Sequence, residues 1–574
     1  MSPAGPRPRL LLTELATVAF IGLLALWRLR PLSLDPAAVP PQRDAAFTTI
    51  GLRHLQRALT GELPLLEAPL GYPSVHSLTQ ADWMLGQALF TLPLSFIDPV
   101  RIGVFVSLVG IVLSAWALHH VARAVWGPGP HSLLAPLLGG LGAMTIDNAH
   151  HLNLVWHAPA TWGVLLLCVG MTAGRLGAAI GGGLLVGSAA HFGFYTGAHA
   201  AAVSAMALLA LARWPGRRVA VGAGLGLLLG FLSVLPVLDL FLDGAAALGA
   251  GTGAASSQEG QWNPLHAWAI GGRAPAVESW RPALPLLVLA LVALRRWRWQ
   301  ARPLLVVAGA CALLALGAAP VIGSLALPVP GPHALLDALT GSQLRAPGRW
   351  LFWTEAALAV LACGAVVRSR RAVTWAVVAV VVVTVATRRP LRSVPRAQIA
   401  VPTVFADLSA TAPGEPVFER FGREGQGSGL GRLHALLADP LPVVVGHYAR
   451  VSPVRADFIA AASKWPDPDA DRLLRAAGVG TVVIHEPSED WATRTDGRCA
   501  QGSDGSWRCR LGAPPPFKVP LPESADTERV ELVCSPGVRA EVSVSGWAAL
   551  ARLRGEASVV AWLDDCPAPI REEL

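Results

Sequence analysis

A carboxylate in the polar stretch after the first apolar run is a side chain that could do chemistry. The stretch RDAAFTTIGLRHLQRALTGELP starts at Arg43, and Asp44 follows that arginine directly. A carboxylate can accept a proton from an attacking hydroxyl group, and a guanidinium can bind a phosphate leaving group through paired hydrogen bonds. Asp44 is therefore a candidate catalytic residue, while an ordinary solvated loop aspartate would fit the same pattern.

Similar side chains recur in later polar stretches. The other candidate catalytic carboxylates are Asp82 and Asp147. The candidates for substrate binding are Arg53, Arg57, His150, His151, Asn153, His157, Arg345 and Arg349. The last two are four residues apart and would share one face of a helix. They are either phosphate-binding residues or cations that anchor a helix at the membrane interface.

The stretch DNAHHLNLVWHAP has simpler interpretations as well. Asp147 could cap the next helix, and His150 and His151 could cap a helix or face lipid headgroups. Three histidines within eight positions could also hold a divalent metal. A closed zinc site needs fixed spacing and a fourth ligand, so we assign no metal ligand and leave the cofactor open.

The composition indicates a membrane protein. The chain has 574 residues, of which 53% are hydrophobic and 15% charged, whereas soluble domains carry about 25% charged residues. The net charge of +8 comes mostly from arginine and is spread along the chain. No clustered basic face with aromatic residues is present, so a nucleic-acid partner is not expected.

Apolar runs long enough to cross a bilayer recur through residues 1–389. A span needs about 20 residues. We predict about eleven spans, which form a mainly α, polytopic transmembrane helix bundle. They lie near 10–27, 100–118, 132–147, 158–174, 177–192, 198–213, 219–241, 281–295, 303–325, 350–367 and 372–388. Residues 82–97 are shorter and amphipathic, which is typical of an interfacial or re-entrant helix.

Arginine clusters predict the orientation. If the spans alternate, most clusters fall on one side, which should be the cytoplasm together with the N-terminus. The large loops 28–81, 242–280 and 326–349 then lie outside, with all the candidate residues. Arg28, Arg30, Arg43, Arg345 and Arg349 also fall outside, where positive charge needs another explanation.

Residues 390–574 differ sharply from the rest. They contain the only two lysines and no run long enough to span. Short β-like runs such as PVFER, LPVVVGHYA, GTVVIHEP and EASVVAWLDD alternate with helical stretches such as DADRLLRAAG. This pattern predicts a soluble α/β or α+β domain outside the membrane.

The cysteines agree with this division. Cys168, Cys311 and Cys363 lie in apolar runs, whereas Cys499, Cys509, Cys534 and Cys566 lie in the predicted outer domain. Four cysteines in an oxidising compartment favour two disulfides, and chain order suggests 499–509 and 534–566 among three possible pairings. A zinc site is the alternative, but no CxxC or HxxxH spacing supports it.

Several motifs together resemble the C-type superfamily of polytopic glycosyltransferases, and more narrowly a set of bacterial glycosyltransferase-like membrane proteins. The matching residues are Asp44 early in the first outer loop, Arg57, Gly61 and Pro64 after it, His151, Leu152, Asn153 and Pro159, and the runs LRAPGRW and LLRAAGVGTVVIHE.

The resemblance implies a function and roles for these residues. It implies an enzyme of the bacterial plasma membrane that takes a hexosyl or pentosyl group from a polyprenyl-phosphate carrier. The acceptor on the outer face would be a glycan, a lipid or a protein. In the superfamily an acidic residue of the first outer loop acts near the acceptor or the donor phosphate, and Asp44 matches it. The usual paired acidic motif is not clear in this stretch.

Two other classes of function stay open. A transporter or flippase for a lipid or polysaccharide would typically show internal repeats, broken helices and ionisable residues within spans. A non-catalytic protein of cell-envelope assembly would use its outer domain to bind a partner. Convergence of the candidate residues in one place would favour the enzyme.

Overall fold

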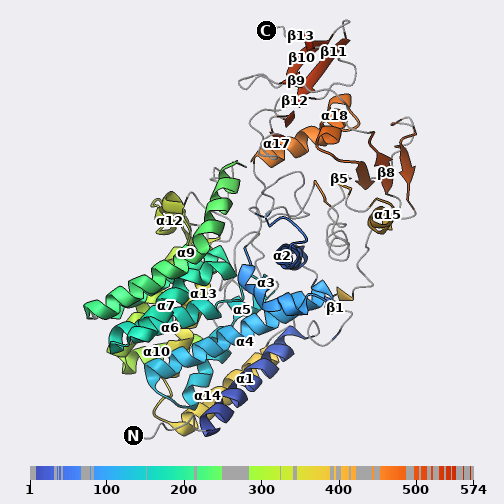
Figure 1. The fold of residues 1–574 in the computed structure, drawn as a ribbon. Helices are drawn as coiled ribbons and strands as arrows, with labels where there is room; N and C mark the ends of the chain where they lie inside the picture. The colour runs from blue at the N-terminus through green and yellow to red at the C-terminus, as the bar shows by residue number, and fades with distance from the viewer. Residues whose placement is uncertain are drawn as a thin grey trace.

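The computed structural model describes most of the helical part and the core of the C-terminal domain, which we call the outer domain after its predicted location. The described residues are 8–30, 35, 38–40, 43–65, 78, 83–149, 151–211, 216–247, 284–322, 325–340, 346–387, 394–395, 403–412, 415–421, 442–444, 453–485, 491, 495, 497–502, 506–512, 519–520, 529–534, 538–543, 546–547, 549–550, 560–561 and 569–570. They form a helical bundle with a smaller, sheet-containing part at one end (Figure 1).

The bundle is built from apolar helices. They are α1 (Pro8–Leu29), α4 (Pro99–Trp126), α6 (Ala158–Ala173), α7 (Leu176–Ser188), α8 (Phe194–Leu211), α9 (Arg217–Ala247), α10 (Leu284–Arg296), α11 (Arg298–Ala315), α13 (Leu351–Cys363) and α14 (Arg370–Thr387). Four described segments are long and apolar enough to cross a membrane, namely Leu11–Leu29, Pro99–Trp126, Phe194–Leu211 and Arg217–Leu240. The chain is a mainly helical membrane protein, and the number of eleven spans stays a prediction.

The prediction of a single span over 132–147 is wrong. This stretch is divided into the 3-10 helix η3 (Pro130–Leu133), the π-helix η4 (Pro136–Gly140) and the short helix α5 (Ala143–Asp147). The chain stays helical through Pro136 to Gly140 and breaks at Leu141 and Gly142, among the glycines at 139, 140 and 142, which weaken a helix. The break places backbone polar groups of residues 141–144 inside the bundle.

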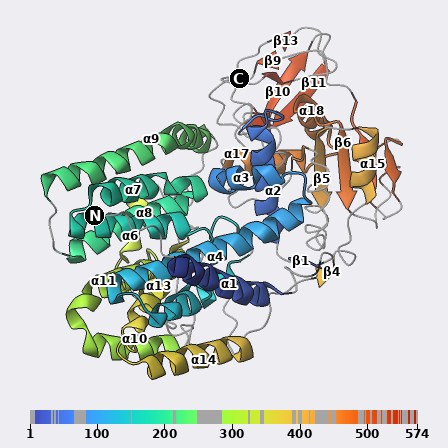
Figure 2. The same cartoon turned by 60° about the horizontal axis from the view of Figure 1, so that its bottom comes forward.

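Helices α7 and α9 pack with their backbones in contact. A Cβ atom on Gly183 would lie 2.4 Å from the carbonyl oxygen of Ala223, and one on Gly226 would lie 2.2 Å from that of Ile180. Small residues allow such close approach between apolar helices. In both views α9 forms the outermost layer of the bundle over α7 (Figures 1 and 2).

The predicted loop 28–81 contains the helix α2 (Arg43–Leu59). Gln56 of α2 is buried, and its Nε2 donates to the carbonyl and hydroxyl oxygens of Thr91, at 3.2 and 3.0 Å. Thr91 ends α3 (Leu85–Thr91), which η2 (Leu92–Leu94) continues. Both views show α2 between the bundle and the outer domain (Figures 1 and 2). The described part of this loop, residues 43–65, is therefore a folded cover rather than a slack connection.

Short strands connect further parts of the chain. The strand β1 (Ala38–Val39) pairs with β4 (Val394–Pro395), which joins the first loop to the beginning of the outer domain. Between α11 and α13 lie the hairpin of β2 (Val321–Ile322) and β3 (Leu325–Ala326), the helix α12 (His333–Thr340) and the 3-10 helix η7 (Pro347–Trp350).

The outer domain is an α+β structure, as the alternating runs predicted. Its main sheet has the strand order β5-β6-β8-β7, from β5 (Val417–Phe421), β6 (Thr481–His485), β7 (Cys499–Gln501) and β8 (Trp507–Arg510). Only β5 and β6 are parallel within this sheet, and α17 (Pro453–Ala462) and α18 (Pro468–Ala476) lie between them in sequence. The other described elements are α15 (Thr403–Thr411), β9 (Val519–Pro520), β10 (Arg529–Cys534), β11 (Val538–Ser543), β12 (Val560–Ala561) and β13 (Pro569–Ile570).

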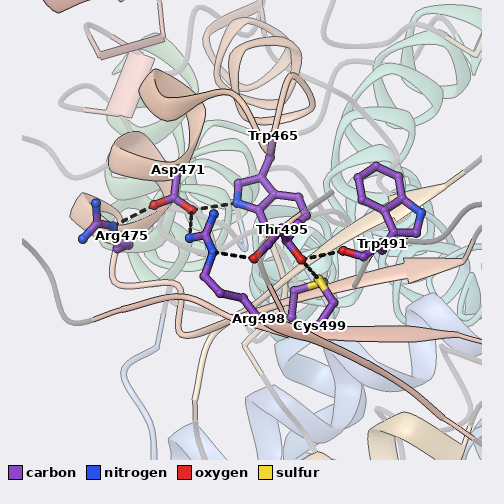
Figure 3. Close-up of polar contacts among 8 residues, drawn as sticks. Trp465, Asp471, Arg475, Trp491, Thr495, Arg498 and Cys499 are labelled. Atoms are coloured by element: carbon purple, nitrogen blue, oxygen red, sulfur yellow. Dashed lines mark hydrogen bonds and ion pairs between the residues drawn. A yellow bond between two sulfur atoms is a disulfide. The ribbon is translucent and has the colours of Figure 1, made fainter. Parts of the chain in front are cut away.

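Asp471 of α18 organises the core of the outer domain. Its Oδ1 accepts hydrogen bonds from Trp465 Nε1 and Arg498 Nη1, both at 2.9 Å, and its Oδ2 pairs with Arg475 at 3.0 Å (Figure 3). Cys499 and Cys509 form the predicted disulfide between β7 and β8. Cys566, the predicted partner of Cys534, lies outside the described residues.

Candidate functional site

Two of the predicted motifs meet at the start of α13. His157 precedes α6, and its ring centre lies 4.4 Å from that of Phe352 and 6.0 Å from that of Trp353. Phe352 and Trp353 directly follow the run LRAPGRW. The HLN…P segment and the LRAPGRW segment, far apart in the chain, therefore lie against each other.

Arg349 and His199 extend this contact to α8. The guanidinium carbon of Arg349 lies 4.2 Å from the centre of the Tyr195 ring, and the His199 ring lies 4.0 Å from that of Trp350. His157, His333 and Arg349 all lie near His199. We call His157, Tyr195, His199, His333 and Arg349 the histidine–arginine cluster.

Several polar atoms of the cluster are buried among apolar residues and have no hydrogen-bond partner. Both ring nitrogens of His199 and the hydroxyl of Tyr195 are buried and have no hydrogen-bond partner. Two more such atoms, Asn153 Oδ1 and Thr196 Oγ1, belong to residues that lie beside Gly193. Because buried polar groups in proteins are normally hydrogen-bonded, several orphaned ones together are typical of a place that binds a polar ligand.

Gly193 allows this polar group to assemble. Its φ of 142° is a conformation that residues with a side chain rarely adopt. A Cβ atom there would lie 3.3 Å from the carbonyl oxygen of Asn153 and 3.4 Å from Thr196 Oγ1. A larger residue at this position would therefore push apart the two segments that supply the orphaned atoms.

The charge of the cluster comes from Arg349. Burial lowers the pKa of His157 to about 4, so its imidazole is neutral near pH 7 and can donate or accept a hydrogen bond. Arginine side chains stay protonated in proteins. The cluster thus combines the permanent cation of Arg349 with the neutral imidazole of His157 and the hydroxyl of Tyr195, an arrangement suited to a phosphate or another anion.

The side chains of the three predicted catalytic carboxylates are not among the described parts of the structure. Asp44 lies in the first turn of α2 and Asp147 ends α5, and the side chains of both are outside the described residues. Asp82, His150 and Arg345 lie wholly outside them. Their roles stay predictions.

Contacts of Arg53, Arg57 and His151 lie elsewhere in the fold. Arg53 Nη1 donates to the carbonyl oxygen of Ser95 at 2.6 Å, which ties α2 to the turn after η2. Arg57 forms a surface ion pair with Glu62 at 2.9 Å. The amide of His151 donates to the carbonyl oxygen of Asn148 in a turn. None of these contacts brings the residue to the histidine–arginine cluster.

The sequence prediction missed Tyr195, His199, His333 and Glu355. Glu355 of α13 is only 2% exposed, and its Oε2 accepts a hydrogen bond at 3.0 Å from the amide of Met144, at the start of α5. An ionisable residue within an apolar span is a signal of a functional or structural site. Glu355 stood within the predicted span 350–367 and could have been found by that rule.

A metal site does not emerge from the described residues, where no group of three or more His, Cys, Asp or Glu side chains could hold an ion.

Comparison with known proteins gives structural neighbours only. No model of a protein family matches the chain, and no curated protein matches it. Two cryo-EM structures of arabinofuranosyltransferase AftD from Mycobacteria are similar, with TM-scores of 0.47 and 0.46 and identities of 17% and 16%. They cover 94% and 96% of this chain, which spans 42% and 41% of theirs.

Proposed function

We propose that the chain is a membrane glycosyltransferase that moves a sugar from a polyprenyl-phosphate carrier to an acceptor on the outer face of the membrane. The observation that carries this proposal is the convergence of His157, Tyr195, His199 and Arg349, from three separate parts of the chain, into one buried polar cluster. A cation beside neutral hydrogen-bonding groups suits the phosphate of a lipid carrier, and the surrounding apolar helices suit its hydrocarbon chain.

In the proposed reaction the acceptor's hydroxyl oxygen attacks the anomeric carbon of the sugar. A new carbon–oxygen bond forms as the bond between that carbon and the phosphate oxygen breaks. Asp44 takes the hydroxyl proton, and the lipid phosphate leaves with the bonding electrons, stabilised by Arg349. Asp82 and Asp147 are the other candidates for an acidic role. Asp44 stands in the first turn of α2, between the bundle and the outer domain, which supports a role with an acceptor that approaches from the outer side.

The test is a transfer assay on the purified protein with a panel of polyprenyl-phosphate sugars. Wild type and Asp44→Asn are compared in parallel, because the amide keeps the shape but cannot accept the proton. Loss of a general base should lower turnover by about 10²–10⁴-fold. Undiminished transfer by the variant would remove Asp44 from the mechanism, and absence of transfer from every donor would count against the enzyme itself.

A lipid transporter is the second candidate, and one observation favours it. The stretch 130–147 is a broken helix, and Glu355 is an ionisable residue buried beside the break. Transporters use broken helices and buried charges in this way. Reconstitution into vesicles distinguishes the two functions, because a transporter would move a lipid-linked sugar across the bilayer without changing it.

A further inference from the structure

Arg28 is a buried cation at the carboxyl-terminal end of α1. Its side chain is 4% exposed and continues the inward stripe of Ile21 and Ala25. Arg30, two residues later, is exposed, and its guanidinium carbon lies 5.5 Å from the ring of Trp27, which is 47% exposed. One arginine therefore turns to the surroundings of the helix, and the other turns into the bundle.

The hydrogen bonds of Arg28 do not compensate its charge. Nη2 donates to the carbonyl oxygen of Leu141 at 2.9 Å, in the break that follows η4. Nε and Nη1 have no partner, although they carry three of the five N–H donors of a guanidinium. No ion pair joins Arg28 to a carboxylate in the part of the chain that the structure describes.

A buried arginine with an uncompensated charge and unbonded N–H groups is expected to bind an anion. Removing a charge from water is costly unless the charge is paired and hydrogen-bonded, and one carbonyl oxygen does not pair it. Snorkelling to the interface, the usual solution near a helix end, does not apply, because the side chain is buried. The remaining solution is a ligand with a negative charge and several acceptor oxygens.

The position of Arg28 selects the kind of anion. The outward face of α1 exposes Leu12 and Leu23, as a helix in contact with lipid tails does. Arg28 stands in the last turn of this apolar segment, the depth at which the hydrocarbon region gives way to the headgroups. We propose that Arg28 binds the phosphate group of a membrane lipid, with Nε and Nη1 as the donors.

Two kinds of lipid carry this group, an isoprenoid phosphate and an anionic phospholipid. The first would make Arg28 part of donor binding and so rests on the proposed function. The second would make it a site for bilayer lipid that is independent of any transfer reaction. Binding measurements without a sugar or an acceptor separate this proposal from the proposed function.

The experiment measures binding of two probes to the full-length protein in detergent. The probes are farnesyl phosphate and dioleoyl phosphatidylglycerol, each titrated while thermal unfolding is followed. Wild type is compared with Arg28→Gln and Arg28→Lys. Arg30→Gln is the matched control, because it removes an exposed guanidinium from the same end of the same helix.

The apparent Kd of at least one probe should rise about tenfold or more in Arg28→Gln, the effect of losing hydrogen bonds to a charged group. Arg30→Gln should change it by no more than about threefold. If Arg28→Gln does not fold, Arg28→Lys decides, since a lysine keeps the charge but presents fewer donors, and it should also weaken binding. A loss for farnesyl phosphate alone identifies the carrier lipid, and a loss for phosphatidylglycerol alone identifies bilayer lipid. Unchanged affinity for both probes in the folded variants would overturn the proposal.

Discussion

The guanidinium of Arg349 stacks on the ring of Tyr195, with 4.2 Å between its central carbon and the ring centre. The contact joins η7 to α8 and fixes the plane of the guanidinium. A planar cation held in this way keeps its N–H donors directed along its edges, ready for a phosphate.

Arg349→Ala should therefore weaken donor binding. Loss of hydrogen bonds to a charged group corresponds to a rise in the donor KM of about 10–100-fold, with a smaller effect on kcat. Transfer assays at varied donor concentration measure it. Arg368→Ala is the matched control, because Arg368 also stacks on an aromatic ring, Trp297 at 4.6 Å, but follows the other end of α13. Equal KM values for both variants would contradict a phosphate role for Arg349.

Glu355→Ala should destabilise the bundle by about 1–3 kcal/mol, because the buried amide of Met144 loses its acceptor. Glu355→Gln should cost less, since the amide oxygen can still accept that hydrogen bond. Thermal unfolding in detergent compares the two. Gly142→Ala tests the same contact from the other side, because its Cβ would lie 2.5 Å from Glu355 Cδ. Similar losses for Ala and Gln would show that the hydrogen bond contributes little.

Cys499→Ser should loosen the edge of the outer sheet. The disulfide closes a loop with a sequence separation of 10, which corresponds to about 2–3 kcal/mol in the chain-entropy description. Hydrogen exchange of β7 and β8 in the full-length protein should become faster after reduction or substitution. Cys168→Ser, at a free cysteine of the bundle, controls for the chemistry of the change. Unchanged exchange would mean that packing alone holds this edge.

The cover formed by α2 should become less stable in acid. Burial lowers the pKa of His54, although its Nε2 contacts the carbonyl oxygen of Leu65 at 3.1 Å. The unfolded chain, with a histidine pKa of about 6.5, binds a proton more readily than the folded one. Stability is therefore complete above pH of about 6.5 and declines as the pH falls below that value toward the lower folded pKa.

Limited proteolysis of residues 43–65 at pH values on both sides of this range measures the effect. In His54→Asn the dependence on pH should be weaker, because the asparagine does not titrate. A wild-type cleavage rate that stays constant across the range would refute this account.

The sequence predicted the helices because their signal is local. The apolar runs that became α4 and α9 are long enough to be recognised without knowledge of their neighbours. The strands β5 and β6 were visible for the same reason. The prediction over 132–147 was wrong because the apolar composition of this stretch resembles a span, although the helix breaks after Gly140 in a glycine-rich segment.

The site was only partly predictable, because it depends on contacts between distant residues. His157 and Arg349 carried motifs and were proposed. His199 and Tyr195 stand in or beside an apolar run, where nothing local shows that they face Trp350 and Arg349. Likewise, no local pattern shows that Arg28 lies inside the bundle while Arg30 lies outside.

The backbone contact between α7 and α9 has a mechanical consequence. Gly183 and Gly226 leave no room for even one added carbon atom, so neither helix can rotate or slide without separating the pair. Two helices packed in this way are expected to move together as one rigid unit of the bundle. Any opening between helices of the bundle is therefore expected elsewhere, between helices that meet through flexible side chains.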